Sequence, residues 1–106
     1  MNEHDDRNIF KTRVQKWATK LDVPVKTVSL RQMRNKWASY STSGRLNFNT
    51  ELLQYEPDII DYVIVHELLH ASVPNHGKLW KSLMVAYLGD YQSLEKRLHG
   101  LSTMDR

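Results

Sequence analysis

The sequence has no cysteine among its 106 residues, and this absence removes several kinds of chemistry at once. Disulfide bridges, thiolate metal ligands and a cysteine nucleophile are all excluded. A metal site in this chain would therefore depend on histidine, carboxylate or carbonyl donors.

Glycine and long apolar runs are also scarce. The four glycines are scattered, so they do not form the phosphate-binding loop of nucleotide hydrolases. No apolar stretch approaches the ~18–20 residues that cross a membrane. The start of the sequence, over residues 1–10, is polar and acidic and does not predict a signal peptide. We therefore expect a cytoplasmic protein that does not enter a membrane.

Basic residues exceed acidic residues only slightly, and the formal net charge is +3. This excess is too weak by itself to indicate a nucleic-acid partner, and we do not expect one. The 41% hydrophobic and 25% charged residues are an ordinary globular balance. The length fits one domain with one small core, which we place at residues 1–100, followed by a C-terminal tail at 101–106.

Apolar periodicity and turn signals predict the elements of this domain. Helices are predicted at 6–21, 57–72, 78–88 and 91–99, with Gly100 ending the last, and a short helical turn is predicted near Thr50. Strands are predicted at 25–30, 36–41 and 45–49, the last two joined as a hairpin through Gly44. The order predicts an α+β fold with a small three-stranded, mainly antiparallel sheet packed on helices.

The most informative stretch is VIVHELLHASVPNH, at residues 63–76. His66 and His70 are four residues apart on a predicted helix, so both imidazoles lie on one face and can bind one zinc ion. Glu67 points about 100° away from His66, which suits a general base acting on a metal-activated water. A catalytic zinc site has three protein ligands, and His76, beyond the turn at Pro74, is the natural third.

The alternative is that these histidines are core residues satisfied by other protein groups. Two imidazoles and a carboxylate on an otherwise apolar helix would cost several kcal/mol to bury unless each found partners. One metal ion would satisfy all three, so the spacing favours a single catalytic Zn²⁺ bound by His66, His70 and His76, with Glu67 as the catalytic residue.

Beyond this motif, the chain resembles the minigluzincins, a family of very short zinc metallopeptidase zymogens. The resemblance covers nearly the whole chain. It rests on the hairpin MRNKWASYSTSGRLNFN at 33–49, the helix PDIIDYVIVHELLH at 57–70 and the segment NHGKLW at 75–80. The family is related in fold to the catalytic domains of HtpX-type membrane peptidases. The resemblance implies a minimal gluzincin-like scaffold in which the same three histidines bind zinc and Glu67 is general base and acid.

The resemblance also implies a substrate and a regulated state. A peptide or protein substrate would bind along the edge strand at 36–41. The enzyme would be a latent proenzyme whose C-terminal segment, starting near His99, blocks the cleft. It would be a monomer, or a dimer if that segment is exchanged between two copies.

Several points stay open at this level. The oxyanion of the reaction needs a stabilising group besides the metal, and the sequence does not choose among Tyr40, Tyr87, Tyr91 and His99. The rival functions are an SprT-like protease acting on DNA-bound proteins, a non-catalytic zinc-binding module and a pyrophosphatase-like hydrolase. The first would use the basic residues around the hairpin: Arg31, Arg34, Lys36 and Arg45.

Overall fold

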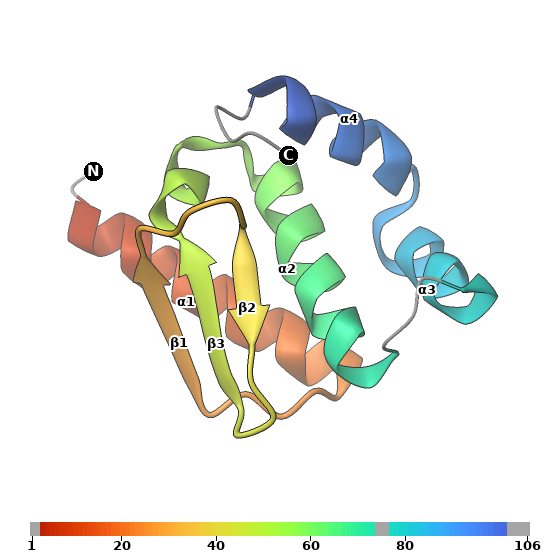
Figure 1. Cartoon of the computed structure of the whole chain (residues 1–106), viewed down its shortest axis with the longest axis horizontal. Coiled ribbons are helices and arrows are strands. Elements are labelled where there is room, and N and C mark those ends of the chain that lie inside the picture. The colour runs from red at the N-terminus through yellow and green to blue at the C-terminus, as the bar shows by residue number, and fades with distance from the viewer. Residues whose placement is uncertain (1–2, 74–76, 102–106) are drawn as a thin grey trace.

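A computed structural model of the chain describes residues 3–73 and 77–101. The elements run in the order α1 (Glu3–Leu21), β1 (Thr27–Arg31), β2 (Ala38–Tyr40), β3 (Arg45–Asn49), the 3-10 helix η1 (Thr50–Gln54), α2 (Pro57–Ser72), α3 (Lys78–Leu88) and α4 (Tyr91–Leu101). Figure 1 shows α1 crossing one face of the sheet, with α2 beside β2 and α3 and α4 on the far side of α2. The α+β class with a three-stranded sheet is confirmed. No described helix is long and apolar enough to cross a membrane.

The sheet has the strand order β1-β3-β2. The hairpin makes β2 and β3 antiparallel, with Ser39 opposite Asn47. In contrast, β1 pairs in parallel with β3, with Ser29 also opposite Asn47. The sheet is thus mixed, and the expectation of a mainly antiparallel sheet holds for one of its two pairings. The sequence signal for the hairpin is local. The edge of the hairpin to which β1 adds depends instead on the path that residues 32–37 take from β1 to β2.

Gly44 closes the hairpin because its backbone conformation suits a residue without a Cβ. Its φ is +89°, and a Cβ there would lie 3.0 Å from the Cγ of Lys26. The Gly44 N–H donates to the carbonyl of Ser41, and the Gly44 carbonyl accepts from the N–H of Lys26. This turn therefore sets the register of β2, the strand next to α2.

Helix α2 is the centre of the molecule. Its buried residues are distributed around most of its circumference: Ile59, Tyr62, Val63, Ile64, Val65, Leu68 and Leu69. A helix that is apolar all round must be covered on all sides, and α2 contacts α1, β2, α3 and α4. Pro57 stands in its first turn, as the sequence predicts, and the helix ends at Ser72. The rigid core therefore fixes the helix that carries the proposed catalytic residues.

One ion pair ties α1 to α2 in a partly buried position. The Arg13 guanidinium donates to both carboxylate oxygens of Asp61, at 2.5 and 3.0 Å, and the Trp17 indole N–H donates to Asp61 at 2.9 Å. The Asp61 side chain is only 19% exposed. Three donors on one half-buried carboxylate make it a structural anchor for α2.

Replacing Asp61 by Ala is expected to destabilise the fold by roughly 1–3 kcal/mol, because it leaves half-buried donors on Arg13 and Trp17 without their acceptor. The melting temperature should fall by about 5–15 °C. Glu56→Ala is the matched control, since Glu56 also pairs with an arginine but its side chain is 69% exposed; it should cost less than about 1 kcal/mol. Equal melting temperatures for the two variants would contradict the anchor role.

Helix α4 lies against α2 through both apolar and charged contacts. Arg97 donates to Glu56 at 2.5 Å and to Asp58 at 2.8 Å, and its hydrogen bond lowers the pKa of the Asp58 carboxyl. These side chains are 42–69% exposed, so solvent screens the pairs and they stabilise the contact only weakly. Tyr91 and Leu98 are buried, and burying each is worth ~1.5–3 kcal/mol. Apolar burial therefore dominates the attachment of α4.

The end of α4 differs from the sequence prediction. The helix continues through Gly100 to Leu101 instead of ending at Gly100. Glycine lowers helix propensity by about 1 kcal/mol but does not forbid the conformation. The Leu101 carbonyl lies 3.4 Å from the Tyr55 hydroxyl, which donates to it. The last residues of the expected tail, 102–106, lie outside the described part of the chain.

Candidate active site

His66 and His70 lie together on α2, as their spacing predicts. Their ring centroids are 4.6 Å apart, with the planes inclined at 71°, and both residues are half-buried. Two half-buried imidazoles at this separation are a suitable donor pair for one metal ion. The expectation that both face the same side of the helix is therefore consistent with the geometry.

Two aromatic residues surround the histidine pair. The Trp80 ring of α3 lies 5.3 Å from the His66 ring and 6.0 Å from the His70 ring, measured between centroids. The Tyr62 ring lies 5.6 Å from that of His66. Trp80 and Tyr62 thus restrict the directions in which the imidazoles can turn. Trp80 is itself buried. Tyr62 was not singled out from the sequence, although its place four residues before His66 on the helix would have indicated it.

Glu67 borders a cavity of about 220 Å³ that it shares with His66. The cavity lies between α2, the start of β2 and α4, and it is also lined by Lys36 and His99. Burial raises the pKa of the Glu67 carboxyl, and the positive charge of Lys36 offsets part of this rise. A raised pKa makes the ionised carboxylate a stronger proton acceptor, which suits a general base.

The third donor predicted from the sequence, His76, lies outside the described residues. Within residues 3–73 and 77–101, no three histidine or acidic side chains come close enough to hold a metal ion together. The donor chemistry of His66 and His70 fits zinc, which favours imidazole nitrogen in tetrahedral sites. The pair would supply two of the three protein ligands that a catalytic zinc site requires.

The structure separates the four candidates for oxyanion stabilisation. The Tyr40 hydroxyl donates to the carbonyl of Pro24 at 2.8 Å, and the Tyr87 ring packs on Trp17. Tyr91 is buried against Trp80, and the Trp80 ring lies between it and the histidines. His99 lines the cavity beside His66 and Glu67, so of these four it is the one placed at the site.

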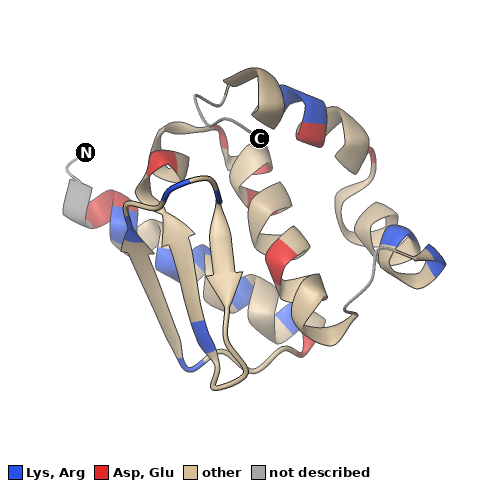
Figure 2. Ribbon diagram, viewed as in Figure 1, with Lys and Arg blue, Asp and Glu red and all other residues tan. Residues whose placement is uncertain are grey.

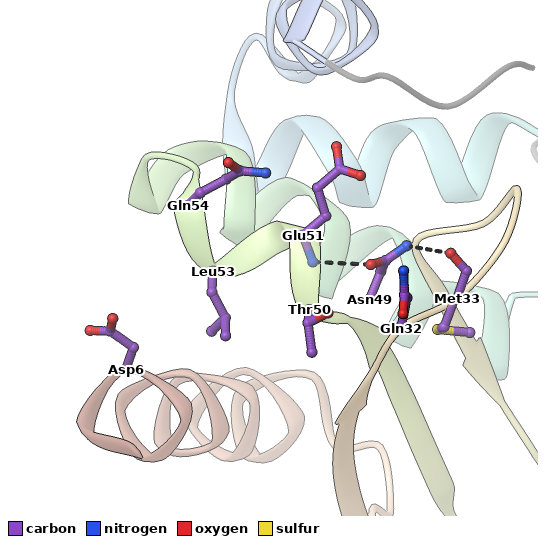
Figure 3. Close-up of a pocket in the computed structure, with 8 residues that line it drawn as sticks. All are labelled: Asp6, Gln32, Met33, Asn49, Thr50, Glu51, Leu53 and Gln54. Atoms are coloured by element: carbon purple, nitrogen blue, oxygen red, sulfur yellow. Dashed lines mark hydrogen bonds between the residues drawn. The ribbon is translucent and has the colours of Figure 1, made fainter. Parts of the chain in front are cut away.

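A larger cavity, of about 560 Å³, lies elsewhere, between α1, η1 and the end of β1 (Figure 3). Its central polar side chain is already engaged. Asn49 donates to the carbonyl of Met33 and accepts from the N–H of Glu51. Among the described residues, His66, His70 and Glu67 do not line it, so size alone does not make it the active site.

The basic residues expected around the hairpin lie toward both ends of the sheet (Figure 2). Arg45 pairs with Thr27 at one end of the β1–β3 ladder, whereas Arg31 stands at the other end. Four residues of strand separate them by about 13 Å. The spread charges give little support to the SprT-like alternative, which needs a continuous DNA-binding surface.

Comparison with known proteins gives two kinds of match. The family model of the YgjP-like metallopeptidase domain matches residues 3–100. Among solved structures, the metallopeptidase zymogen of Methanocaldococcus jannaschii jannalysin has a TM-score of 0.76 at 21% identity, covering 86% of this chain and 94% of that chain. The metallopeptidase zymogen of Pyrococcus abyssi abylysin has a TM-score of 0.72 at 22% identity, covering 91% and 99%. These structures share the fold. The search of curated proteins gave no match.

Proposed function

The chain belongs to the YgjP-like metallopeptidase domain family, and we propose that it is a zinc-dependent endopeptidase whose site is built on α2. The observation that carries this proposal is the His66–His70 pair, with ring centroids 4.6 Å apart, beside the half-buried Glu67. His66, His70 and His76 are the proposed ligands of one Zn²⁺, and Glu67 is the proposed general base and acid.

The mechanism assigns each described residue a task. A bound zinc ion would lower the pKa of a water molecule and polarise the scissile carbonyl. Glu67 accepts a proton from the attacking water and returns it to the leaving amine, for which its raised pKa is suited. His99 is a candidate for donating a hydrogen bond to the oxyanion, because it lines the same cavity. Trp80 and Tyr62 hold the imidazoles in position.

The substrate is proposed to be an extended peptide that pairs with β2. This strand is at an edge of the sheet and lies next to α2. An edge strand offers free backbone groups to an added strand, which gives affinity without strict sequence specificity. Ala38 of the short strand β2 lines the same cavity as Glu67, so a peptide paired with this strand would pass close to Glu67.

Latency is a further part of the proposal. The inhibitory segment would start near His99, and residues 101–106 would form its tail beyond a domain at 1–100. Two features support it: His99 lines the cavity, and the end of α4 is held by Tyr55 through the Leu101 carbonyl. The similar structures of jannalysin and abylysin are both described as zymogens.

Removing residues 100–106 is therefore expected to raise peptidase activity by at least about tenfold. The assay is hydrolysis of fluorogenic peptides by the zinc-loaded chain, with and without these residues and with a chelator as the metal control. Replacing residues 102–106 by a Gly/Ser sequence of equal length would separate the effect of the residues from that of chain length. High activity of the full chain, unchanged on truncation, would overturn latency. Chelator-insensitive or absent hydrolysis in every form would overturn the proposed function.

A further inference from the structure

Helix α1 carries a row of positive charges that is only partly neutralised. Residues 7–20 hold five basic side chains and no acidic one, and Figure 2 shows basic residues along this helix. Arg13 is neutralised by Asp61 of α2. Within residues 3–73 and 77–101, Lys16 and Lys20 form no ion pair. Both lysines are exposed, so their charges are available to an anionic partner.

Surface depressions follow the same side of α1 and join one another. The first lies between α1, η1 and the start of α2, with Ile9, Leu53 and Ile60 in its wall. The next shares Ile9 and Arg13 with the first. The last also contains Arg13 and reaches Lys20. Together they form one continuous depression, the α1 groove, which runs from Ile9 to Lys20.

The α1 groove is apolar at one end and basic at the other. Ile9 is 52% exposed, and it lies beside Leu53 and Ile60, which are partly buried against the core. The other end contains Lys16 and Lys20. The groove shares no lining residue with the cavity beside Glu67. It is therefore a surface distinct from the proposed active site.

The spacing of these residues indicates the shape of a partner. Lys16 and Lys20 follow Ile9 by seven and eleven residues, so all three share one face, and they lie about 10 and 16 Å from Ile9 along the axis. A second helix beside α1 matches this spacing and satisfies its own backbone hydrogen bonds, which the side of a helix cannot do for an extended chain. In an antiparallel arrangement, the N-terminal half of the partner meets the lysines, and acidic residues are favoured there by the helix dipole.

The groove suits a protein helix better than a nucleic acid or a membrane. Asp6 lines its apolar end and Asp61 its basic end, and these carboxylates would repel a continuous row of phosphates. Among the described residues of α1, Ile9 is the only large hydrophobic side chain that is mainly exposed, which is too little apolar surface for membrane insertion. A helix can place single carboxylates at Lys16 and Lys20 and avoid both aspartates.

We propose that the α1 groove binds an acidic amphipathic helix of a partner protein. The partner places an aliphatic side chain against Ile9 and one carboxylate at each of Lys16 and Lys20. It lies antiparallel to α1, with its two acidic residues four positions apart and the aliphatic residue seven positions after the second. The proposal does not depend on the proposed peptidase function, because the groove lies outside the cavity that contains Glu67.

The probe is a fluorescein-labelled synthetic helix of about 18 residues, long enough to be helical in an alanine-rich host. It carries two glutamates and a leucine at the proposed spacing, and its binding to the full chain is followed by fluorescence anisotropy. Lys16→Glu/Lys20→Glu should raise the Kd at least about tenfold, because two attractions become repulsions. Lys11→Glu/Lys81→Glu makes the same change of net charge at exposed positions outside the groove. It should change the Kd by less than about twofold.

Two further variants test the charge and apolar contacts separately. A peptide with lysines in place of the glutamates should bind Lys16→Glu/Lys20→Glu more tightly than wild type. Ile9→Ser should weaken the original peptide about three- to tenfold, because it removes a half-exposed aliphatic contact. Circular dichroism should show an unchanged fold in every variant, since the replaced side chains are exposed.

No binding of a peptide that is helical in solution would overturn the proposal, as would equal weakening by the two double lysine variants. An unchanged Kd in Ile9→Ser would contradict the apolar anchor. Phosphatidylglycerol vesicles and duplex DNA are tested in parallel. If either bound in a manner that depends on Lys16 and Lys20 while the peptide did not bind, the groove would be a membrane or nucleic-acid contact and the proposed helix partner would be wrong.

Discussion

Glu67→Gln is expected to lower kcat/KM for peptide hydrolysis by about 10²–10⁴-fold while the protein keeps its zinc. Glutamine has nearly the same shape as glutamate but cannot accept the proton of the attacking water, so it removes general base catalysis alone. The assay compares fluorogenic-peptide turnover in wild type and variant, each with and without residues 100–106, and zinc is quantified in every preparation.

The matched control is Glu56→Gln, which changes the same chemical group on an exposed side chain at the start of α2. It should alter kcat/KM by less than about twofold. Full turnover in Glu67→Gln with zinc retained would rule out Glu67 as the proton-transfer group, although the metal site could still stand. Loss of zinc together with activity would instead indicate that Glu67 supports the ligands.

His70→Ala should weaken zinc binding by more than ~100-fold. Loss of a residue that only orients a metal ligand typically costs 10–100-fold in affinity, so loss of a ligand should cost at least that much. Isothermal titration with zinc measures the change directly. Circular dichroism in the absence of zinc checks the fold, because His70 is half-buried and contacts Trp80.

His99→Ala is the histidine control for this experiment. His99 lines the same cavity but is not among the proposed ligands, so its loss should change zinc affinity by less than about threefold. If His70→Ala and His99→Ala weakened zinc binding equally, the zinc ligands would include His99 of α4, and the proposed ligand set would be wrong. An unchanged zinc affinity in His70→Ala would show that His70 is not a zinc ligand.

The parts of the fold with strong local signals could be predicted from the sequence. Helix α2 was predicted at 57–72, as observed, because Pro57 marks its start, Pro74 stands just beyond its end and its interior is strongly apolar. Helix α3 was also predicted with its observed bounds. Because two histidines four residues apart must share one face of a helix, the approach of His66 and His70 follows once α2 is a helix.

The features that depend on distant residues could not be predicted in this way. The parallel pairing of β1 with β3 depends on how residues 32–37 cross the sheet, and no residue type in this segment predicts that path. The continuation of α4 through Gly100 reflects a small local penalty that the rest of the helix outweighs. The cavity beside Glu67 combines Trp37 and Leu98, which are 61 residues apart in the chain. Only packing brings such residues together.

The measurement that tests the central claim most directly is the zinc content of the purified full-length chain, determined by elemental mass spectrometry after reconstitution and removal of free metal. We predict about one zinc ion per chain, as a site of three histidines requires. An absence of bound zinc in the correctly folded wild type would mean that protein contacts alone satisfy His66 and His70, and it would contradict the proposed zinc-dependent peptidase.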